Sequence, residues 1–93
     1  MIKSFAELET EKVYRGELSK KLPPDIQKTG RRKLIYLDEA DILLDLLAPP
    51  GNRLEALKGN RQGQHSIRIN DQWRICFIWR QPHAYEVEIT DYH

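Results

Sequence analysis

The chain ends in three residues that could move a proton or contact a ligand: Asp91, Tyr92 and His93. They directly follow a predicted strand. An imidazole has an ordinary pKa of about 6.5, so His93 can accept or donate a proton near neutral pH. The alternative interpretation is that Tyr92 packs at a sheet edge, Asp91 bonds to solvent or backbone, and His93 lies in water. The choice between the two depends on what lies beside these residues.

Positive charge is concentrated in the second half of the chain, although the net charge is only +1. Residues 1–47 carry nine acidic and nine basic side chains. Between residues 53 and 80 the only acids are Glu55 and Asp71, and the bases are Arg53, Lys58, Arg61, Arg68, Arg74 and Arg80. The low net charge argues against a protein that holds nucleic acid through a global positive field. A local basic surface is predicted instead.

The segment GNRLEALKGNRQGQ contributes three of these cations, Arg53, Lys58 and Arg61, together with three glycines. It lacks the spacing of a Walker phosphate loop, and a flexible basic loop is often a solvated connector. However, it leads into the strand of Arg68, so it can also lean over the same face of the sheet. Lys58 is the most interesting candidate in this loop.

Three strands are predicted for the second half, from the segments HSIRI, WRICFIW and AYEVEI, which are rich in branched and aromatic residues. A loop over residues 70–72 would pair Ile69 with Trp73 and Ile67 with Ile75. A second loop near residues 81–83 completes an antiparallel meander. One face of this sheet is then apolar, with Ile67, Ile69, Trp73, Ile75, Phe77, Trp79, Tyr85, Val87 and Ile89.

The opposite face is mostly polar and carries the remaining side chains by parity: Ser66, Arg68, Arg74, Cys76, Ile78, Arg80, Glu86, Glu88, Thr90 and Tyr92. Arg68 lies directly opposite Arg74 in this register. Such a like-charge pair costs up to about 1 kcal/mol unless an acid or an anion lies between its members. Either Glu88, diagonal to Arg74, neutralises the pair, or the pair binds a phosphate. The pattern favours neither.

The first half supplies the helices that cover the apolar face. MIKSF is predicted to be a strand at the sheet edge, followed by a helix from Ala6 to about Leu18. A long helix begins at Pro23 or Pro24, and a shorter helix or a kink follows before APPGN. The predicted fold is therefore α+β, in a single domain over residues 1–93.

Several classes of protein are not expected. Cys76 is the only cysteine and the three histidines are scattered, so neither a disulfide nor a metal site is predicted, and no cofactor is expected. No apolar run approaches the roughly 20 residues of a membrane-spanning helix, and MIKSFAELET lacks the apolar stretch of a signal peptide. The expected location is the cytoplasm.

Two segments, PPGNRLEALKGNRQGQHSIRINDQWRICFIW and the final VEITDYH, resemble the HigB-type toxins of the RelE superfamily. The resemblance spans essentially the whole chain. It implies a RelE-like fold and an endoribonuclease that cleaves mRNA on the ribosome without a metal ion. It assigns catalytic roles to Lys58, Arg74, Asp91, Tyr92 and His93.

The basic residues Arg53, Arg61 and Arg68 are then expected to bind RNA. The chain departs from some members of the family at two positions: Glu55 stands where they have a histidine, and Asn70 where they have an arginine. The resemblance also implies a HigA-type antitoxin with a helix-turn-helix motif, through which any contact with DNA would be made. Two alternatives stay open: a protein that blocks translation without cleaving RNA, and an inactive relative that acts only with its antitoxin.

Overall fold

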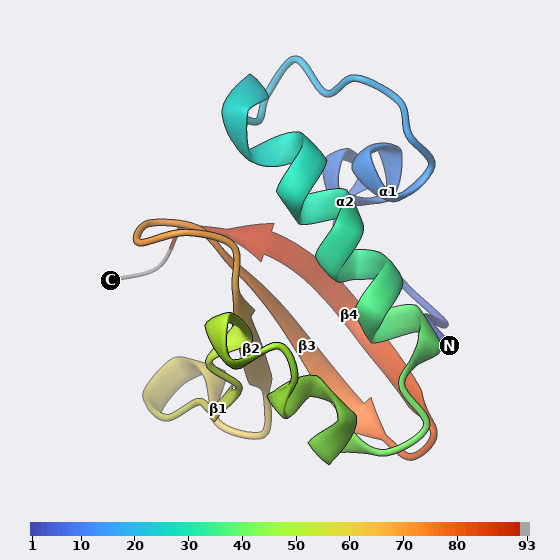
Figure 1. Cartoon of the computed structure of the whole chain (residues 1–93), viewed down its shortest axis with the longest axis vertical. Coiled ribbons are helices and arrows are strands. Elements are labelled where there is room, and N and C mark those ends of the chain that lie inside the picture. The colour runs from blue at the N-terminus through green and yellow to red at the C-terminus, as the bar shows by residue number, and fades with distance from the viewer. Residues whose placement is uncertain (92–93) are drawn as a thin grey trace.

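The structure, a computed structural model, describes residues 1–91 and consists of helices packed on one antiparallel sheet (Figure 1). The sheet order is β1-β2-β3-β4. In chain order the elements are α1 (Leu8–Tyr14), α2 (Pro24–Glu39), the 3-10 helices η1 (Leu43–Leu47) and η2 (Pro50–Asn52), β1 (Glu55–Ala56), η3 (Gly59–Arg61), β2 (His65–Arg68), β3 (Arg74–Arg80) and β4 (His83–Thr90). The predicted α+β class is confirmed.

The register of β2 and β3 is the predicted one. Ile67 pairs with Ile75, and Arg68 pairs with Arg74. The connecting loop is closed by Asn70, whose side-chain oxygen accepts hydrogen bonds from the backbone N–H groups of Gln72 at 2.8 Å and Trp73 at 2.7 Å. This is the ordinary ability of asparagine to replace a backbone acceptor in a turn.

A β-bulge in β4 makes one part of the predicted register wrong. Cys76 pairs with Glu88 but Ile78 pairs with Tyr85, so one extra residue lies in β4 at this point. Glu86 adopts a positive φ of 53° there. An extra residue moves every side chain beyond it to the other face. Tyr85 therefore shares the polar face with Ile78, and Ala84, which is fully buried, replaces it on the apolar face.

The N-terminal segment lies at the edge of the sheet, as predicted, but forms isolated bridges rather than a continuous strand. Ile2 and Phe5 bridge Ala84 and Val87 of β4 in parallel orientation. Backbone hydrogen bonds on both sides of each bridge, such as Lys3 N to Ala84 O at 2.8 Å, hold the segment in place. The outer edge of β4 is therefore occupied by the chain itself.

The first helix is shorter than predicted. The Glu7 carboxylate caps its start by accepting hydrogen bonds from the N–H groups of Glu9 at 3.0 Å and Thr10 at 2.8 Å. Gly16, with a φ of +82°, follows its end. The long second helix begins with Pro24 in its first turn and is followed by the shorter η1, as the sequence indicated.

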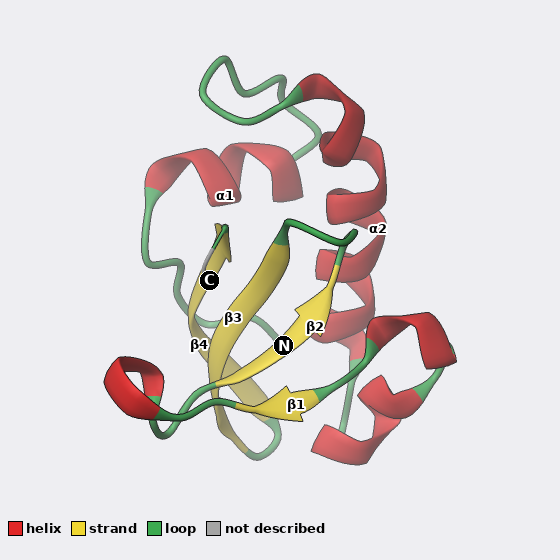
Figure 2. Ribbon diagram, turned by 90° about the vertical axis from the view of Figure 1, so that its left-hand side faces the viewer, coloured by secondary structure: helices red, strands yellow, loops and turns green. Residues whose placement is uncertain are grey.

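Helix α2 packs against the apolar face of the sheet, to one side of the strands in Figure 2. Gly30 allows the close approach, because a Cβ at this position would lie 3.5 Å from the Cδ1 atoms of both Ile69 and Ile89. Leu34, Leu37 and Phe77 have no measurable exposure. Burying an aliphatic or aromatic side chain of this size contributes roughly 1.5–3 kcal/mol. The opposite face of the sheet is left for polar side chains.

Candidate active site

Arg74, the first residue of β3, is a firmly held cation of the polar face. Its Nε donates a hydrogen bond to Ser66 Oγ at 2.8 Å, and its Nη2 donates to the backbone oxygen of Arg53 at 2.7 Å. Glu55 Oε1 lies 3.7 Å from the same Nε, beyond hydrogen-bond distance. The side chain retains 17% exposure. Arg74 is therefore fixed by the protein but is not sealed from solvent.

Local backbone structure explains both hydrogen bonds. Arg53 ends η2 in the left-handed conformation, with φ 46° and ψ 56°. The turn presents its carbonyl oxygen to the guanidinium of Arg74. Ser66 is fully buried in β2, where it pairs with Glu55 of β1 and Cys76 of β3. The hydrogen bond from Arg74 to this buried hydroxyl is therefore partly shielded from water and restricts the guanidinium.

Two acids, Asp71 in the turn after β2 and Glu55 in β1, relieve the repulsion between Arg68 and Arg74. Arg68 forms an ion pair with Asp71 in the turn after β2. The hydrogen bond from Arg68 lowers the pKa of Asp71 from its ordinary value, with smaller contributions from the charges of Arg68 and Arg53. Glu55 lies beside Arg74. The interpretation that Glu88 neutralises Arg74 needs correction, because Glu88 lies beside Arg61 instead.

Arg61 brings the basic loop over the sheet. Its Nη1 lies 3.3 Å from Glu88 Oε1 and donates to Gln64 Oε1 at 3.1 Å. Beneath this loop, Cys76 is only 1% exposed, and burial raises the pKa of its thiol to about 11. The expectation that the loop leans over the polar face therefore holds for Arg61.

Lys58 stands at the N-cap of η3, between β1 and β2, and its side chain is exposed. Within residues 1–91 the structure records no hydrogen bond or ion pair for its ammonium group. The structure thus brings Arg53, Arg61, Arg68 and Arg74 onto or around one face, whereas Lys58 lies on the loop that borders it. Its predicted role is not tested by these contacts.

The C-terminal residues begin beside this cluster. Thr90 pairs directly with Arg74, and Asp91 follows it. The Asp91 Oδ2 atom accepts a hydrogen bond from Gln72 Nε2 at 2.8 Å, so it is held near the turn between β2 and β3. Tyr92 and His93 lie outside the described residues, and their predicted roles stay predictions.

Lys33 is a buried cation that sequence reasoning missed. It is 5% exposed, and its Nζ donates a hydrogen bond to the backbone oxygen of Arg68 at 2.6 Å. Burial lowers the pKa of Lys33, and the charges of Arg32, Arg68 and Arg74 lower it further. A signal was present in the sequence, because position 33 lies on the same helical stripe as Ile26, Gly30 and Leu37.

Two kinds of feature are not found in the part of the chain that the structure describes. Residues 1–91 contain no group of three or more His, Cys, Asp or Glu side chains that could hold a metal ion. No helix in this range is long and apolar enough to span a membrane. What the polar face does offer is a set of guanidinium groups, the donors that suit a phosphate best.

The same fold is found in solved structures. Two solved structures of the YoeB–YefM complex from Staphylococcus aureus each contain a chain with the same fold, at a TM-score of 0.61 and 19% identity. The match covers 100% of the present chain and 98% of that chain. At this level of identity the likeness establishes the fold alone.

The family is established by the sequence. Residues 3–93 match the HigB-like toxin family, described as the RelE-like toxin of the type II toxin-antitoxin system HigB, and the chain belongs to this family. The resemblance to HigB-type toxins is thereby confirmed.

Three relatives are similar over different lengths. Toxin HigB-1 of Vibrio cholerae serotype O1 is 48% identical over 58 residues, which is 62% of this chain and 61% of the relative. An uncharacterised protein of Haemophilus influenzae is 30% identical over 81 residues, 77% of this chain and 80% of the relative. Endoribonuclease HigB of Proteus vulgaris is 42% identical over 41 residues, 44% of this chain and 45% of the relative. The matched part of the first and third relatives is therefore less than two thirds of their length.

Proposed function

We propose that this protein is an endoribonuclease toxin that cleaves translated mRNA on the ribosome and so inhibits translation. The observation that carries the proposal is the fixed, partly exposed guanidinium of Arg74 beside Arg68, on the polar face of the sheet. Family membership and the relative named Endoribonuclease HigB support it.

The reaction proposed is attack of a ribose 2′-oxygen on the adjacent phosphorus. The O2′–P bond forms, the P–O5′ bond breaks, and a 2′,3′-cyclic phosphate is left. A base takes the proton of the 2′-hydroxyl, and an acid gives a proton to the departing 5′-oxygen. Cations must stabilise the extra negative charge on the phosphorane between these two events.

The residues divide between these tasks. Arg74 and Lys58 stabilise the phosphorane, and Arg53, Arg61 and Arg68 bind the flanking RNA backbone. His93 takes part in proton transfer, and Asp91 orients its imidazole. Tyr92 donates a hydrogen bond to the RNA or stacks on a nucleobase. No metal ion is required by this scheme. The low net charge of +1 is consistent with a substrate that is positioned largely by the ribosome.

The partners follow from the same proposal. An antitoxin of the HigA type, with a helix-turn-helix motif, neutralises the toxin and makes any contact with DNA. The ribosome and its mRNA are the targets, and the cytoplasm is the compartment in which they meet.

The test compares Arg74→Ala with Arg80→Ala, which removes an exposed arginine from the other end of the same strand. Arg74→Ala is expected to lower mRNA cleavage by about 10²–10³-fold, as loss of a preorganised charge-stabilising donor does. Arg80→Ala should retain growth arrest. Primer extension on translated messages reports the new 5′ ends, and circular dichroism checks that both variants are folded.

Deletion of residues 91–93 is a second variant and should also abolish cleavage. Full toxicity of both Arg74→Ala and the deletion would contradict the proposal. Growth arrest by the wild-type protein with intact message would favour a protein that blocks translation without cleavage. Harmless expression of the wild-type protein would favour an inactive relative.

A further inference from the structure

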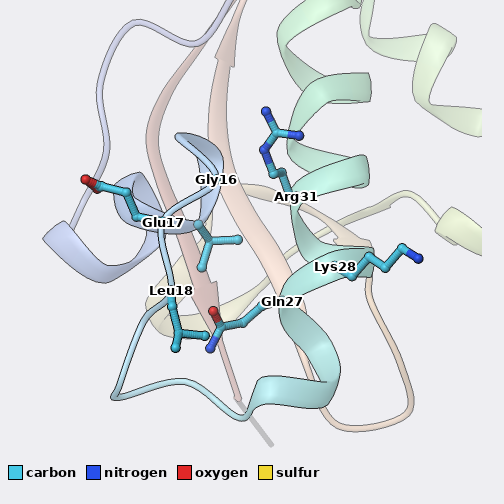
Figure 3. Close-up of a pocket in the computed structure, with 7 residues that line it drawn as sticks. Gly16, Glu17, Leu18, Gln27, Lys28 and Arg31 are labelled. Carbon is cyan, nitrogen blue, oxygen red and sulfur yellow. The ribbon is translucent and has the colours of Figure 1, made fainter.

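A groove lies between the two helices, in the layer of the molecule that does not carry the candidate site. One hollow of about 210 Å³ is lined by residues on both of its sides (Figure 3): Val13, Gly16, Glu17, Leu18, Gln27, Lys28 and Arg31. A second hollow of about 330 Å³ continues along α2 and is lined by Lys28, Arg31, Arg32 and Ile35. The two hollows adjoin at Lys28 and Arg31, which line both, and together they are called here the helix groove.

The rim of the helix groove is strongly basic. Lys28, Arg31 and Arg32 come from one turn of α2, against a single acid, Glu17, on the facing segment. Arg31 donates from Nε to the backbone oxygen of Tyr14 at 3.2 Å, which ties the two helices together. Within residues 1–91, Lys28 and Arg32 take part in no recorded ion pair. Their charges are therefore available to an acidic partner.

The walls of the same groove carry aliphatic surface. Leu18 is 72% exposed, and it lies on the segment that follows α1, across the hollow from Gln27 of α2 (Figure 3). Ile35 contributes a half-buried side chain at the other end. An exposed aliphatic side chain beside unpaired cations fits a segment that offers both apolar side chains and carboxylates.

This combination favours protein over RNA. A phosphodiester backbone has no aliphatic surface to cover Leu18. A protein segment with acidic and aliphatic residues can satisfy the cations and the leucine together. The groove also lies in the helical layer, whereas Arg74 lies on the opposite face of the sheet. A partner bound there would not need to enter the RNA site.

We infer that the helix groove is a docking site for an acidic, amphipathic segment of a partner protein, with Lys28 and Arg32 binding its carboxylates and Leu18 its aliphatic side chains. The identity of this partner rests on the proposed function, under which it is the antitoxin. The groove would then anchor the antitoxin on a surface separate from the catalytic residues.

The test measures binding of the purified product of the neighbouring reading frame to the full chain by isothermal titration calorimetry. The variant Lys28→Glu/Arg32→Glu reverses the two exposed charges, and Leu18→Ser removes the aliphatic contact. The charge reversal should weaken binding at least about tenfold, and Leu18→Ser by a few fold. Arg31 is left intact because it joins the two helices. The matched control, Lys3→Glu/Arg80→Glu, reverses two exposed charges elsewhere and should bind as the wild type does.

Growth assays separate this inference from the proposed function. A groove variant should still arrest growth when expressed alone, and should continue to arrest it when the neighbouring product is co-expressed. A groove variant that is toxic but fully neutralised would overturn the docking site and leave the nuclease proposal standing. A wild-type chain that arrests no growth would contradict the proposed function, while the calorimetric comparison still decides the groove.

Three other outcomes would overturn the inference. The first is a wild-type chain that does not bind the neighbouring product. The second is loss of mRNA cleavage in the groove variants with partner binding unchanged, which would assign the groove to RNA. The third is self-association of the wild-type chain in sedimentation that the charge reversal abolishes, with binding of the neighbouring product unchanged, which would assign it to a second copy.

Discussion

The hydroxyl of Ser66 holds the guanidinium of Arg74, accepting the Nε–H at 2.8 Å from a position with no solvent exposure. The two residues lie on neighbouring strands of the same face, β2 and β3. Because the hydroxyl is buried, water cannot easily replace it as an acceptor. Ser66 thus positions the arginine that we propose stabilises the reacting phosphate, although it need not touch RNA itself.

Replacement of Ser66 by alanine should loosen Arg74 while leaving the sheet intact. We expect cleavage to fall by about tenfold, since a hydrogen bond to a charged group contributes roughly 1.5–3 kcal/mol. The matched control is Ser19→Ala, which removes another buried hydroxyl, one that donates to Glu9 Oε1 at 2.7 Å. Both variants should lower the free energy of unfolding, but Ser19→Ala should retain full cleavage. Equal cleavage by the two would contradict a positioning role.

The roles of the Arg53 backbone oxygen and of the Arg53 side chain can be tested separately by substitution. Arg53→Gly keeps the backbone oxygen that binds Arg74 and suits the left-handed φ of 46° better than arginine does. The free energy of unfolding should therefore stay the same or rise slightly. If the Arg53 side chain binds RNA, KM should rise severalfold with little change in kcat. A large loss of kcat in a folded variant would assign the side chain to catalysis instead.

Lys33 should make folding stability depend on pH. Burial and the neighbouring positive charges lower its pKa in the folded state below the ordinary value of 10.5. As pH falls below 10.5, the unfolded chain takes up the proton first, so protonation favours unfolding. The resulting loss of folding stability reaches its full size once the pH is below the pKa of Lys33 in the folded state.

The variant Lys33→Met removes this titration. Urea unfolding should show that the wild type gains stability relative to Lys33→Met when pH is raised from 7 toward 10. Lys28→Met removes an exposed ammonium from the same helix and serves as the control. A wild type that loses stability relative to Lys33→Met as pH rises would contradict the assigned direction.

The close packing of α2 on the sheet can be tested at Gly30. A Cβ there would meet Ile69 and Ile89 at 3.5 Å and Val13 at 4.0 Å, all ordinary contact distances. Gly30→Ala should therefore raise the free energy of unfolding by about 0.5–1 kcal/mol, the usual gain from replacing glycine inside a helix. Gly30→Leu should lower it by about 1–3 kcal/mol, because the space does not admit further atoms. Thermal and urea unfolding measure both changes.

Sequence reasoning reached the register of β2 and β3 from the alternation of apolar residues. Only a loop over residues 70–72 places Ile67 opposite Ile75 and keeps the apolar side chains on one face. The bulge at Glu86 had no such signal, since the residue that adopts the positive φ is not a glycine. One unrecognised extra residue was enough to place Tyr85 on the wrong face.

The sequence predicted only part of the candidate site. Parity alone placed Arg68 and Arg74 together on the polar face. The contacts that fix Arg74 involve a backbone oxygen of Arg53 and a small buried hydroxyl, and neither can be inferred from residue types at a given spacing. That Glu55, and not Glu88, lies beside Arg74 likewise depends on the path of the loop before β1. Such features arise only once distant segments meet.

The pairing of residues 1–6 with the outer edge of β4 has a consequence for the behaviour of the chain at high concentration. The backbone groups of Ala84 and Val87 are already hydrogen-bonded to Met1, Lys3, Ser4 and Ala6. A strand of a second molecule therefore cannot pair with them at this edge. Truncation of this segment would uncover a row of donors and acceptors along the longest strand of the sheet. Shortened preparations should accordingly aggregate through that margin, even though every residue of the catalytic proposal would still be in place.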